Sequence, residues 1–464
     1  MLLINGQWVA GGEQLPVRNP FTGSIVGMMT LATRQQASDA ARYAKAFESD
    51  LAAGRRAEIL NGTAADIERE ADAYAEQIVS ECGTCIKEAQ KEVRRAITQF
   101  RICAEETTRL RGEAIPLEGS AHGPQQLAVT IRVPVGLVCA ITPFNRPLNQ
   151  VAVKLGPAIA SNNSVILKPS EKAPLSAIRL VKCLIRNGLP AGMVSLVTGD
   201  PLEVGDALVT NSHVDMITFT GSRAVGERIA RRAGMVKLAL ELGDSGALIV
   251  LKDANLDNAA RAAASGAFST AGQSCRGVKR LLVEDSVADQ FGSLLVRESK
   301  RLNFGDPSLP LNDFGCLIHE SAAVEVERRV SAAIESGAVP LLLSPRMGAV
   351  LGPQVLDHVP RHCELVREET FGPCAPIVRV QDLEDAVSYI NCGDYGLQTG
   401  VFTSNIQQAL RAAQEIRSGA VIINGGPQFE SPFIPFGGVK KSGIGREGPR
   451  FAMQEMTTVR TVVW

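Results

Sequence analysis

The residue best suited to covalent chemistry in this sequence is Cys275, which lies in the segment Gly-Gln-Ser-Cys-Arg at positions 272–276. Small neighbours let a thiol approach a ligand closely, and the adjacent cation Arg276 favours the thiolate, which is the nucleophilic form. Taken alone, a cysteine of this kind is more often an inert core thiol. Its chemistry therefore depends on the groups that the fold brings to it.

Two further residues have the types that a cysteine nucleophile needs beside it. Glu241 lies in the apolar run Ala-Leu-Glu-Leu-Gly at 239–243, at a predicted strand end, where loss of water would raise its pKa toward that of a general base. A helix cap or an ion-paired carboxylate is the other interpretation. Asn145 follows a predicted strand and offers an amide donor for an oxyanion, although asparagine is also common in turns without any catalytic role.

Seven motifs occur in order along the chain. They are Thr-Pro-Phe-Asn at 142–145, Lys-Pro-Ser-Glu at 168–171, Phe-Thr-Gly-Ser at 219–222, Glu-Leu-Gly at 241–243, Gly-Gln-Ser-Cys at 272–275, Glu-Glu-Thr-Phe-Gly-Pro at 368–373 and Pro-Phe-Gly-Gly at 435–438. Together they resemble the aldehyde dehydrogenase superfamily over essentially the whole chain. The segments 142–149 and 272–280 are most similar to the branch with phosphonoacetaldehyde, lactaldehyde and non-phosphorylating glyceraldehyde-3-phosphate dehydrogenases.

The resemblance implies a role for each residue at a matching position. Cys275 is the expected nucleophile, Asn145 an oxyanion donor together with the Cys275 amide, and Glu241 the base for water. The aldehyde would form a hemithioacetal, lose hydride to the nicotinamide, and leave as a carboxylate after hydrolysis of the thioester. Two alternatives stay open. One is a CoA-acylating semialdehyde dehydrogenase, and the other is a catalytically inactive structural or binding member of the fold.

The resemblance also implies a nicotinamide cofactor site at a helix N-terminus. Lys168 and Glu171 are expected to contact the adenosine ribose. Gly221 and Ser222 are expected to contact the pyrophosphate, and Glu369 and Phe371 the nicotinamide riboside. The Glu171 carboxylate would accept bonds from ribose hydroxyls and repel a 2′-phosphate, so NAD is expected to be preferred and NADP remains possible.

Four residues are candidates for binding a small, anionic aldehyde. Arg95 resembles an anion-binding arginine of this branch, and Arg146 directly follows the amide of Asn145, so both could clamp a phosphate, phosphonate or carboxylate. Ser274 and Arg276 flank the nucleophile, where specificity is shaped in this family. Phosphate-specific members often have arginine at the position of Ser274. A surface charge for Arg95 and a salt bridge for Arg146 are the other interpretations.

One departure from the family pattern follows the base: Asp244 stands where another glycine is usual, and we expect it to perturb Glu241 or the local backbone. No metal site is expected, because Cys82 and Cys85 lie in a predicted helical segment without a second cysteine pair.

The elements that must position these residues form two α/β series after a helical scaffold of three predicted helices over 35–111. The first series has strands at 138–142, 164–167, 194–197 and 216–220, and the second at 247–250, 280–283, 339–343, 376–380 and 420–424. Strands that alternate with helices predict parallel sheets. We therefore expect an α/β fold of the aldehyde dehydrogenase type, with two Rossmann-related lobes and a small β element for oligomerisation.

The expected domains are an NAD-binding domain at 1–116 and 134–242, a catalytic domain at 243–439, and a bridging element at 117–133 and 450–464. The tail at 457–464 has the pattern of a strand that pairs with another segment or subunit. By resemblance, the protein forms a homodimer or homotetramer.

Composition restricts the class of partner. The 464 residues include 48 basic and 49 acidic side chains that are interspersed, which argues against binding to nucleic acid or an anionic membrane. The first residues show no basic segment or apolar run typical of a signal peptide, so targeting is not expected. A membrane span is not expected either, and the ten cysteines follow no regular framework. A cytoplasmic enzyme for a small-molecule aldehyde is expected.

Overall fold

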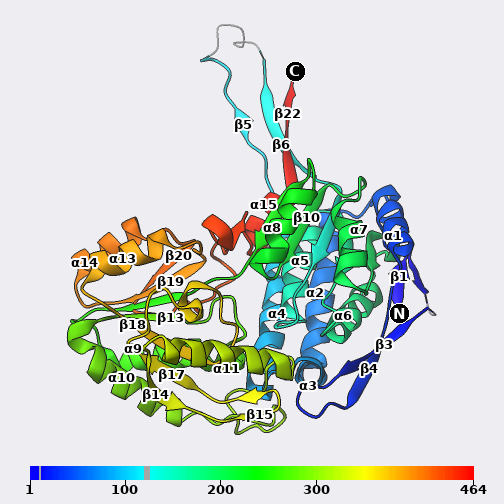
Figure 1. Ribbon diagram of the computed structural model, residues 1–464. Coiled ribbons are helices and arrows are strands. Elements are labelled where there is room, and N and C mark those ends of the chain that lie inside the picture. Colours follow the sequence, from blue (N-terminus) through cyan, green and yellow to red (C-terminus); the bar gives the residue numbers. More distant parts are fainter. Residues whose placement is uncertain (10–11, 120–125) are drawn as a thin grey trace.

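The computed structural model describes residues 1–9, 12–119 and 126–464 as two lobes and a ribbon of strands that projects from the first lobe (Figure 1). Each lobe is built on its own sheet and has its own hydrophobic core. The predicted α/β architecture, with two lobes on largely parallel sheets and a small β element, is therefore confirmed.

The first lobe contains an eight-stranded sheet. The order is β2 (Gln7–Val9), β1 (Leu2–Ile4), β9 (Val194–Leu196), β8 (Ser164–Lys168), β7 (Leu137–Ile141), β10 (Met216–Thr220), β11 (Lys237–Glu241) and β21 (Gly443–Ile444). The strands from β9 to β11 are parallel neighbours, and β1, β2 and β21 are antiparallel additions. The central strands are buried on both faces, which explains their short, almost uniformly apolar runs.

The helical scaffold over 34–107 has four helices where the sequence predicts three. They are α1 (Arg34–Ala46), α2 (Ala53–Arg69), α3 (Ala71–Cys82) and α4 (Ile86–Thr107). The count was wrong because α2 and α3 are separated only by Glu70, with no glycine or proline to mark the break. The helices α5 (Asn149–Ala160), α6 (Leu175–Arg186), α7 (Asp206–Val209) and α8 (Arg223–Arg232) then alternate with the strands.

The second lobe contains a seven-stranded sheet. Its order is β14 (Val339–Leu343), β17 (Gln354–Asp357), β18 (Cys374–Val380), β13 (Arg280–Glu284), β12 (Ala247–Val250), β19 (Gln398–Phe402) and β20 (Ala420–Ile423). Neighbours are parallel except β14, which runs antiparallel to β17, so the expected place of 339–343 in a parallel series was wrong. The sequence also missed β17 and β19. The latter begins with the polar pair Gln398 and Thr399 and contains Gly400.

The projecting ribbon is a three-stranded sheet of β5 (Ala114–Ile115), β6 (Ala128–Pro134) and β22 (Thr457–Val463) (Figure 1). The tail strand β22 pairs with β6 along its whole length, from Thr457 opposite Pro134 to Val463 opposite Ala128. The expected strand therefore has its partner within the same chain. Residues 120–125 of the expected bridging element lie outside the described residues.

The chain returns to the first lobe after the second sheet. Strand β21 adds to β11, and α15 (Pro449–Glu455) packs on α5. This return carries Glu447 to the carboxyl ends of the first sheet, between the two lobes. Within the described ranges, no helix is long and apolar enough to cross a membrane.

Candidate active site

The site lies where the first sheet joins the second. Glu241 is the last residue of β11, and only residues 242–246 separate it from β12. Cys275 follows helix α9 (Leu256–Phe268) and a short turn at Ser269–Gly272, just before β13. The two residues thus come from segments that end at the same junction.

The loop that presents Cys275 has an unusual backbone. Thr270, Ala271 and Gly272 have φ values of 54°, 53° and 71°, three consecutive residues in the left-handed region. For a residue with a side chain this conformation costs on the order of 1 kcal/mol or more, and such backbone collects at functional sites. A Cβ on Gly272 would lie 2.0 Å from the Gly372 carbonyl oxygen, so the loop requires glycine there.

Two side chains hold this loop in place. Lys279 donates from Nζ to the Gly272 carbonyl at 2.6 Å, and Asn145 donates from Nδ2 to the Gln273 carbonyl at 2.9 Å. The second contact brings Asn145 next to the nucleophile loop, as an oxyanion donor requires. An amide nitrogen carries two hydrogens, so one remains for a ligand.

Glu241 is a buried carboxylate without a partner. Its side chain is 2% exposed, and neither oxygen accepts a hydrogen bond from any of the described residues. Burial raises the pKa of Glu241 well above its ordinary value, and the nearby Glu447 carboxylate raises it further. An unpaired buried carboxylate is costly, which argues for a ligand or reactant as its natural partner.

Cys275 is partly exposed and electrostatically coupled to the same carboxylate. Burial raises the pKa of the Cys275 thiol well above its ordinary value, Glu241 raises it further, and Arg276 lowers it. Arg276 therefore lowers the thiol pKa, as expected, but burial and Glu241 raise it by more. The Arg276 guanidinium is ion-paired with Glu430, whose carboxylate lies 2.7 Å from Nη2.

Sequence reasoning missed an ion pair behind the base. Lys154 is 1% exposed and donates from Nζ to Glu447 at 2.8 Å and to the Thr218 hydroxyl at 3.1 Å. This pair lies against Glu241 and contributes opposite effects to its pKa. A lysine in the apolar helix α5 was a visible signal, but its partner is 293 residues away in the sequence and no local pattern joins them.

The residues expected at the phosphate and ribose ends of a cofactor lie on two segments, Gly221 and Ser222 at the start of α8, and Lys168 and Glu171 at and after the end of β8. Ser222 is the N-cap of α8, yet its hydroxyl accepts no bond from the described backbone of that helix. A Cβ on Gly221 would overlap the ring of Phe219, so any larger residue would have to displace that ring. Lys168 is 3% exposed with Nζ 4.0 Å from the Glu171 carboxylate, which is one-third exposed. The open N-terminus of α8 fits a dinucleotide phosphate.

The residues expected at the nicotinamide end lie close to the segment after Glu241 and to Lys279. Glu369 packs against Gly243, and burial raises its pKa to about 7 although Lys279 opposes the shift. The ring of Phe371 meets that of Phe144 edge to face at 6.1 Å, and Lys279 lies over Phe371 at 5.0 Å. Lys279 therefore touches both this end of the site and the nucleophile loop.

The departure at Asp244 acts on the backbone. The carboxylate turns toward β19, where it accepts the Gln398 amide at 3.2 Å, and it lies 3.5 Å from the Ser442 hydroxyl. Burial raises the pKa of Asp244 to about 6. These contacts join the segment after Glu241 to the second sheet. Of the two expected effects of Asp244, on Glu241 or on the local backbone, they favour the second.

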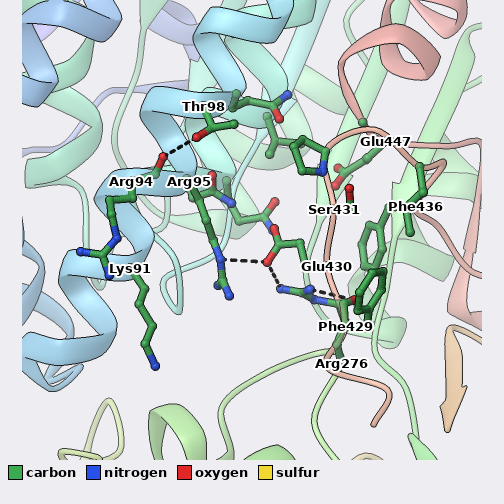
Figure 2. Close-up of a pocket in the computed structure, with 17 residues that line it drawn as sticks. Lys91, Arg94, Arg95, Thr98, Arg276, Phe429, Glu430, Ser431, Phe436 and Glu447 are labelled. Atoms are coloured by element: carbon green, nitrogen blue, oxygen red, sulfur yellow. Dashed lines mark hydrogen bonds and ion pairs between the residues drawn. The ribbon is translucent and has the colours of Figure 1, made fainter. Parts of the chain in front are cut away.

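A cavity of about 330 Å³ opens beside the nucleophile loop (Figure 2). Arg95 and Arg276 line it, together with Glu430 and Glu447. Arg146 is buried behind this wall, 3.6 Å from Glu88 and 3.4 Å from the Thr270 hydroxyl. The Ser274 hydroxyl accepts the Arg276 amide at 3.3 Å. The remaining lining residues are Lys91, Arg94, Thr98, Gln99, Asn149, Gln150, Val153, Phe429, Ser431, Pro432, Ile434, Phe436 and Gly448.

Known proteins share this sequence and fold over nearly their whole length. The profile of the aldehyde dehydrogenase family matches residues 8–462. Aspartate-semialdehyde dehydrogenase 1 of Pseudomonas canavaninivorans is 41% identical over 97% of this chain and 96% of its own. The 3-sulfolactaldehyde dehydrogenase of Priestia megaterium is 39% identical over 100% of this chain and 97% of its own.

A solved structure agrees with both. The glyceraldehyde-3-phosphate dehydrogenase GapN from Methanocaldococcus jannaschii, complexed with NADP, is 38% identical and superimposes with a TM-score of 0.94 over 98% of this chain and 100% of its own. The resemblance drawn from the seven motifs is thereby confirmed. This chain belongs to the aldehyde dehydrogenase family, whose members oxidise aldehydes with NAD or NADP.

Proposed function

We propose that this protein oxidises a small, anionic aldehyde to its carboxylate, with Cys275 as nucleophile, Asn145 as oxyanion donor and Glu241 as base. The observation that carries the proposal is the Glu241 carboxylate, buried at the junction of the sheets with no partner for either oxygen among the described residues. A base that must bind water needs this vacancy on its oxygens.

The chemistry follows from the positions of the side chains. The Cys275 thiol loses its proton to solvent, the thiolate sulfur adds to the aldehyde carbon, and the resulting oxyanion is held by the Asn145 amide and the Cys275 backbone N–H. A nicotinamide cofactor, when bound, supplies the acceptor for the hydride that leaves this carbon. Glu241 then takes a proton from water, the water oxygen attacks the thioester carbon, and the C–S bond breaks to release the carboxylate.

For the cofactor, we propose phosphate contacts at Gly221 and Ser222, ribose contacts at Lys168 and Glu171, and nicotinamide riboside contacts at Glu369 and Phe371. The open N-terminus of α8 supports the first of these. The carboxylate of Glu171 supports a preference for NAD over NADP, since it would repel a 2′-phosphate. The M. jannaschii relative binds NADP, so this preference is a property to be measured on this chain.

For the substrate, the cations at the cavity support an anionic group on the aldehyde. Arg95 and Arg276 line the cavity and are proposed to face that group, with Arg146 adding its charge from behind. Ser274 keeps the position before the nucleophile small. The two relatives are named for 3-sulfolactaldehyde, which carries a sulfonate, and aspartate semialdehyde, which carries a carboxylate beside an ammonium group.

The test is NADH formation by the purified protein with phosphonoacetaldehyde, glyceraldehyde 3-phosphate, succinic semialdehyde and lactaldehyde, with Cys275→Ala as control. The expected result is turnover with the anionic members and none in the variant. Product analysis with and without CoA separates hydrolysis from acyl transfer. A CoA thioester as the main product would replace this proposal with the CoA-acylating alternative, and no turnover with intact folding would favour an inactive member.

We also propose that the projecting ribbon joins subunits into a homodimer or homotetramer. The ribbon exposes apolar side chains on both faces: Leu127, Ile131 and Trp464 lie on one face, Val459 and Val463 lie on the other, and each is at least 42% exposed. Exposed apolar side chains beside a strand edge are typical of interfaces. Light scattering of the full chain against a Val459→Glu variant measures the assembly.

A further inference from the structure

A carboxylate occupies the centre of the cavity wall where the proposed function calls for cations. Glu430 Oε2 lies 3.1 Å from Arg95 Nε and 2.7 Å from Arg276 Nη2, so one oxygen bridges two guanidiniums. Figure 2 shows Glu430 between these two arginines, with Lys91 and Arg94 extending away from it. The seven family motifs do not include this residue.

Glu430 carries a negative charge in this position. Burial alone would raise its pKa, but Arg276 and Arg95 hold the pKa of Glu430 below its ordinary value. Arg146 contributes to the same effect. The bridge is therefore between charged groups and removes part of the positive field from the cavity.

The charges around the cavity can be counted. Two of the lining guanidiniums, those of Arg95 and Arg276, share the single carboxylate of Glu430, which leaves one positive charge in excess at this wall. Arg146 does not line the cavity and is paired with Glu88. Deeper in the wall, Glu447 is neutralised by its ion pair with the buried Lys154.

The two remaining cations are at the mouth. Lys91 and Arg94 are exposed, and Lys91 is 2.6 Å from the Glu88 carboxylate. Water and salt screen charges in such positions, so they contribute little to the interior of the cavity.

The surplus charge is presented by Arg95. Arg276 is held by Glu430 and by the carbonyls of Gln428 and Phe429, both at 3.3 Å. Arg95 meets Glu430 through Nε, and no second carboxylate within the described ranges forms an ion pair with it. A pair of terminal guanidinium nitrogens binds a carboxylate or sulfonate with two parallel hydrogen bonds.

We infer that Glu430 is a specificity residue that limits the cavity to one surplus positive charge, so that the enzyme prefers aldehydes with one negative charge, a carboxylate or sulfonate, over dianionic phosphates and phosphonates. The inference rests on the proposed function. In this inference, Glu430 acts on specificity through its charge, and it also holds Arg95 and Arg276 in position.

The experiment compares two aldehydes of nearly the same shape at alkaline pH, sulfoacetaldehyde with one negative charge and phosphonoacetaldehyde with two. The full-length protein is expected to have the higher kcat/KM for the sulfonate. Glu430→Gln removes one negative charge from the cavity. It should shift the ratio of the two kcat/KM values toward the phosphonate by about tenfold or more. Propionaldehyde, which is neutral, should respond least.

Two controls separate charge from geometry. Glu430→Asp keeps the charge and should keep the preference for the sulfonate. Glu105→Gln makes the same change on α4 at an exposed position next to Arg109 and should leave the ratio unchanged. An unchanged ratio in Glu430→Gln, or an equal loss for both anionic aldehydes, would overturn the inference and leave Glu430 as a support for the arginines.

A binding measurement keeps the inference testable without turnover. Calorimetry with methanesulfonate and methylphosphonate at alkaline pH should give tighter binding of the monoanion to the unmodified protein, and tighter or equal binding of the dianion would contradict the inference. Absence of oxidation with every aldehyde would instead contradict the proposed function, so the two failures are distinguishable.

Discussion

Two buried glutamates of the first lobe differ in what their oxygens touch. Glu81, in α3, is fully buried and accepts hydrogen bonds from the backbone of Leu175 at 2.6 Å, the backbone of Ser176 at 2.9 Å, and the Ser176 hydroxyl. These amides begin α6, so Glu81 caps a helix. Glu241 is equally buried, yet its oxygens have no partner among the described residues.

The comparison teaches that burial and a raised pKa do not distinguish structure from chemistry. Burial raises the pKa of Glu81 to about 7, and it raises that of Glu241 as well. The difference is hydrogen bonding. The hydrogen bonds to Glu81 offset part of the cost of burying its carboxylate, whereas the cost of burying Glu241 is not offset in this way, and that carboxylate is kept for what it does.

The largest effect is expected from Glu241→Gln. The amide cannot take a proton from water, so steady-state turnover should fall roughly 10²- to 10⁴-fold. Thioester formation does not use this base in the proposed mechanism, so stopped-flow absorbance should show a burst approaching one NADH per subunit. Thermal stability should stay equal or rise, because a buried unpaired carboxylate is removed.

Cys275→Ala provides the control, since it should abolish the burst. Full steady-state turnover by Glu241→Gln would assign the base to another residue and end the contrast with Glu81.

The matched change Glu81→Gln should have the opposite profile. Its NH₂ group would face the donors at the start of α6, and at least one buried backbone N–H loses its acceptor. The free energy of unfolding, measured by urea denaturation, should fall by about 1–3 kcal/mol. The kcat of the folded variant should remain close to that of the unmodified enzyme. Normal stability combined with slow hydrolysis would reverse the roles of the two glutamates.

The pH dependence tests the same carboxylate through its neighbour. The pKa values of Cys275 and Glu241 are both raised, so their reactive deprotonated forms become populated only as pH rises. The rate should therefore increase from neutral to alkaline pH, by up to about tenfold per pH unit while one group titrates. In Glu241→Gln, the burst rate should rise at lower pH than in the unmodified enzyme, because the charge that raises the thiol pKa is gone. Identical burst profiles would show that the two groups are not coupled.

Much of this picture could be predicted from the sequence. Buried strands such as β8 and β10 are short apolar runs between helices, and they were found within a residue or two. The proposed nucleophile, base and amide come from the resemblance to a family, because no sequence pattern around Glu81 or Glu241 shows which carboxylate lacks hydrogen-bond partners. Only the fold reveals which of them has hydrogen-bond partners.

The rest could not be predicted because it depends on long-range contacts. Lys154 and Glu447 are 293 positions apart and meet only after the chain returns as β21. Glu430 likewise has no partner near it in the sequence, so its bridge between Arg95 and Arg276 is visible only in the folded protein. Strand β19 was missed because polar residues at its start contact other segments, as Gln398 does with Asp244.

The smallest effect is expected from a substitution of Glu171, the proposed cofactor-binding carboxylate that is exposed to solvent. Glu171 is proposed to repel a 2′-phosphate, but its side chain is one-third exposed and lies 4.0 Å from Lys168. Solvent and the lysine both weaken its field, so Glu171→Gln should raise kcat/KM with NADP relative to NAD by only roughly three- to tenfold. Initial rates with both cofactors measure this ratio. If it does not change, another group excludes the 2′-phosphate. A change in this ratio as large as the effect of Glu241→Gln would mean that cofactor binding removes Glu171 from water. Glu171 would then act in the complex as a buried carboxylate.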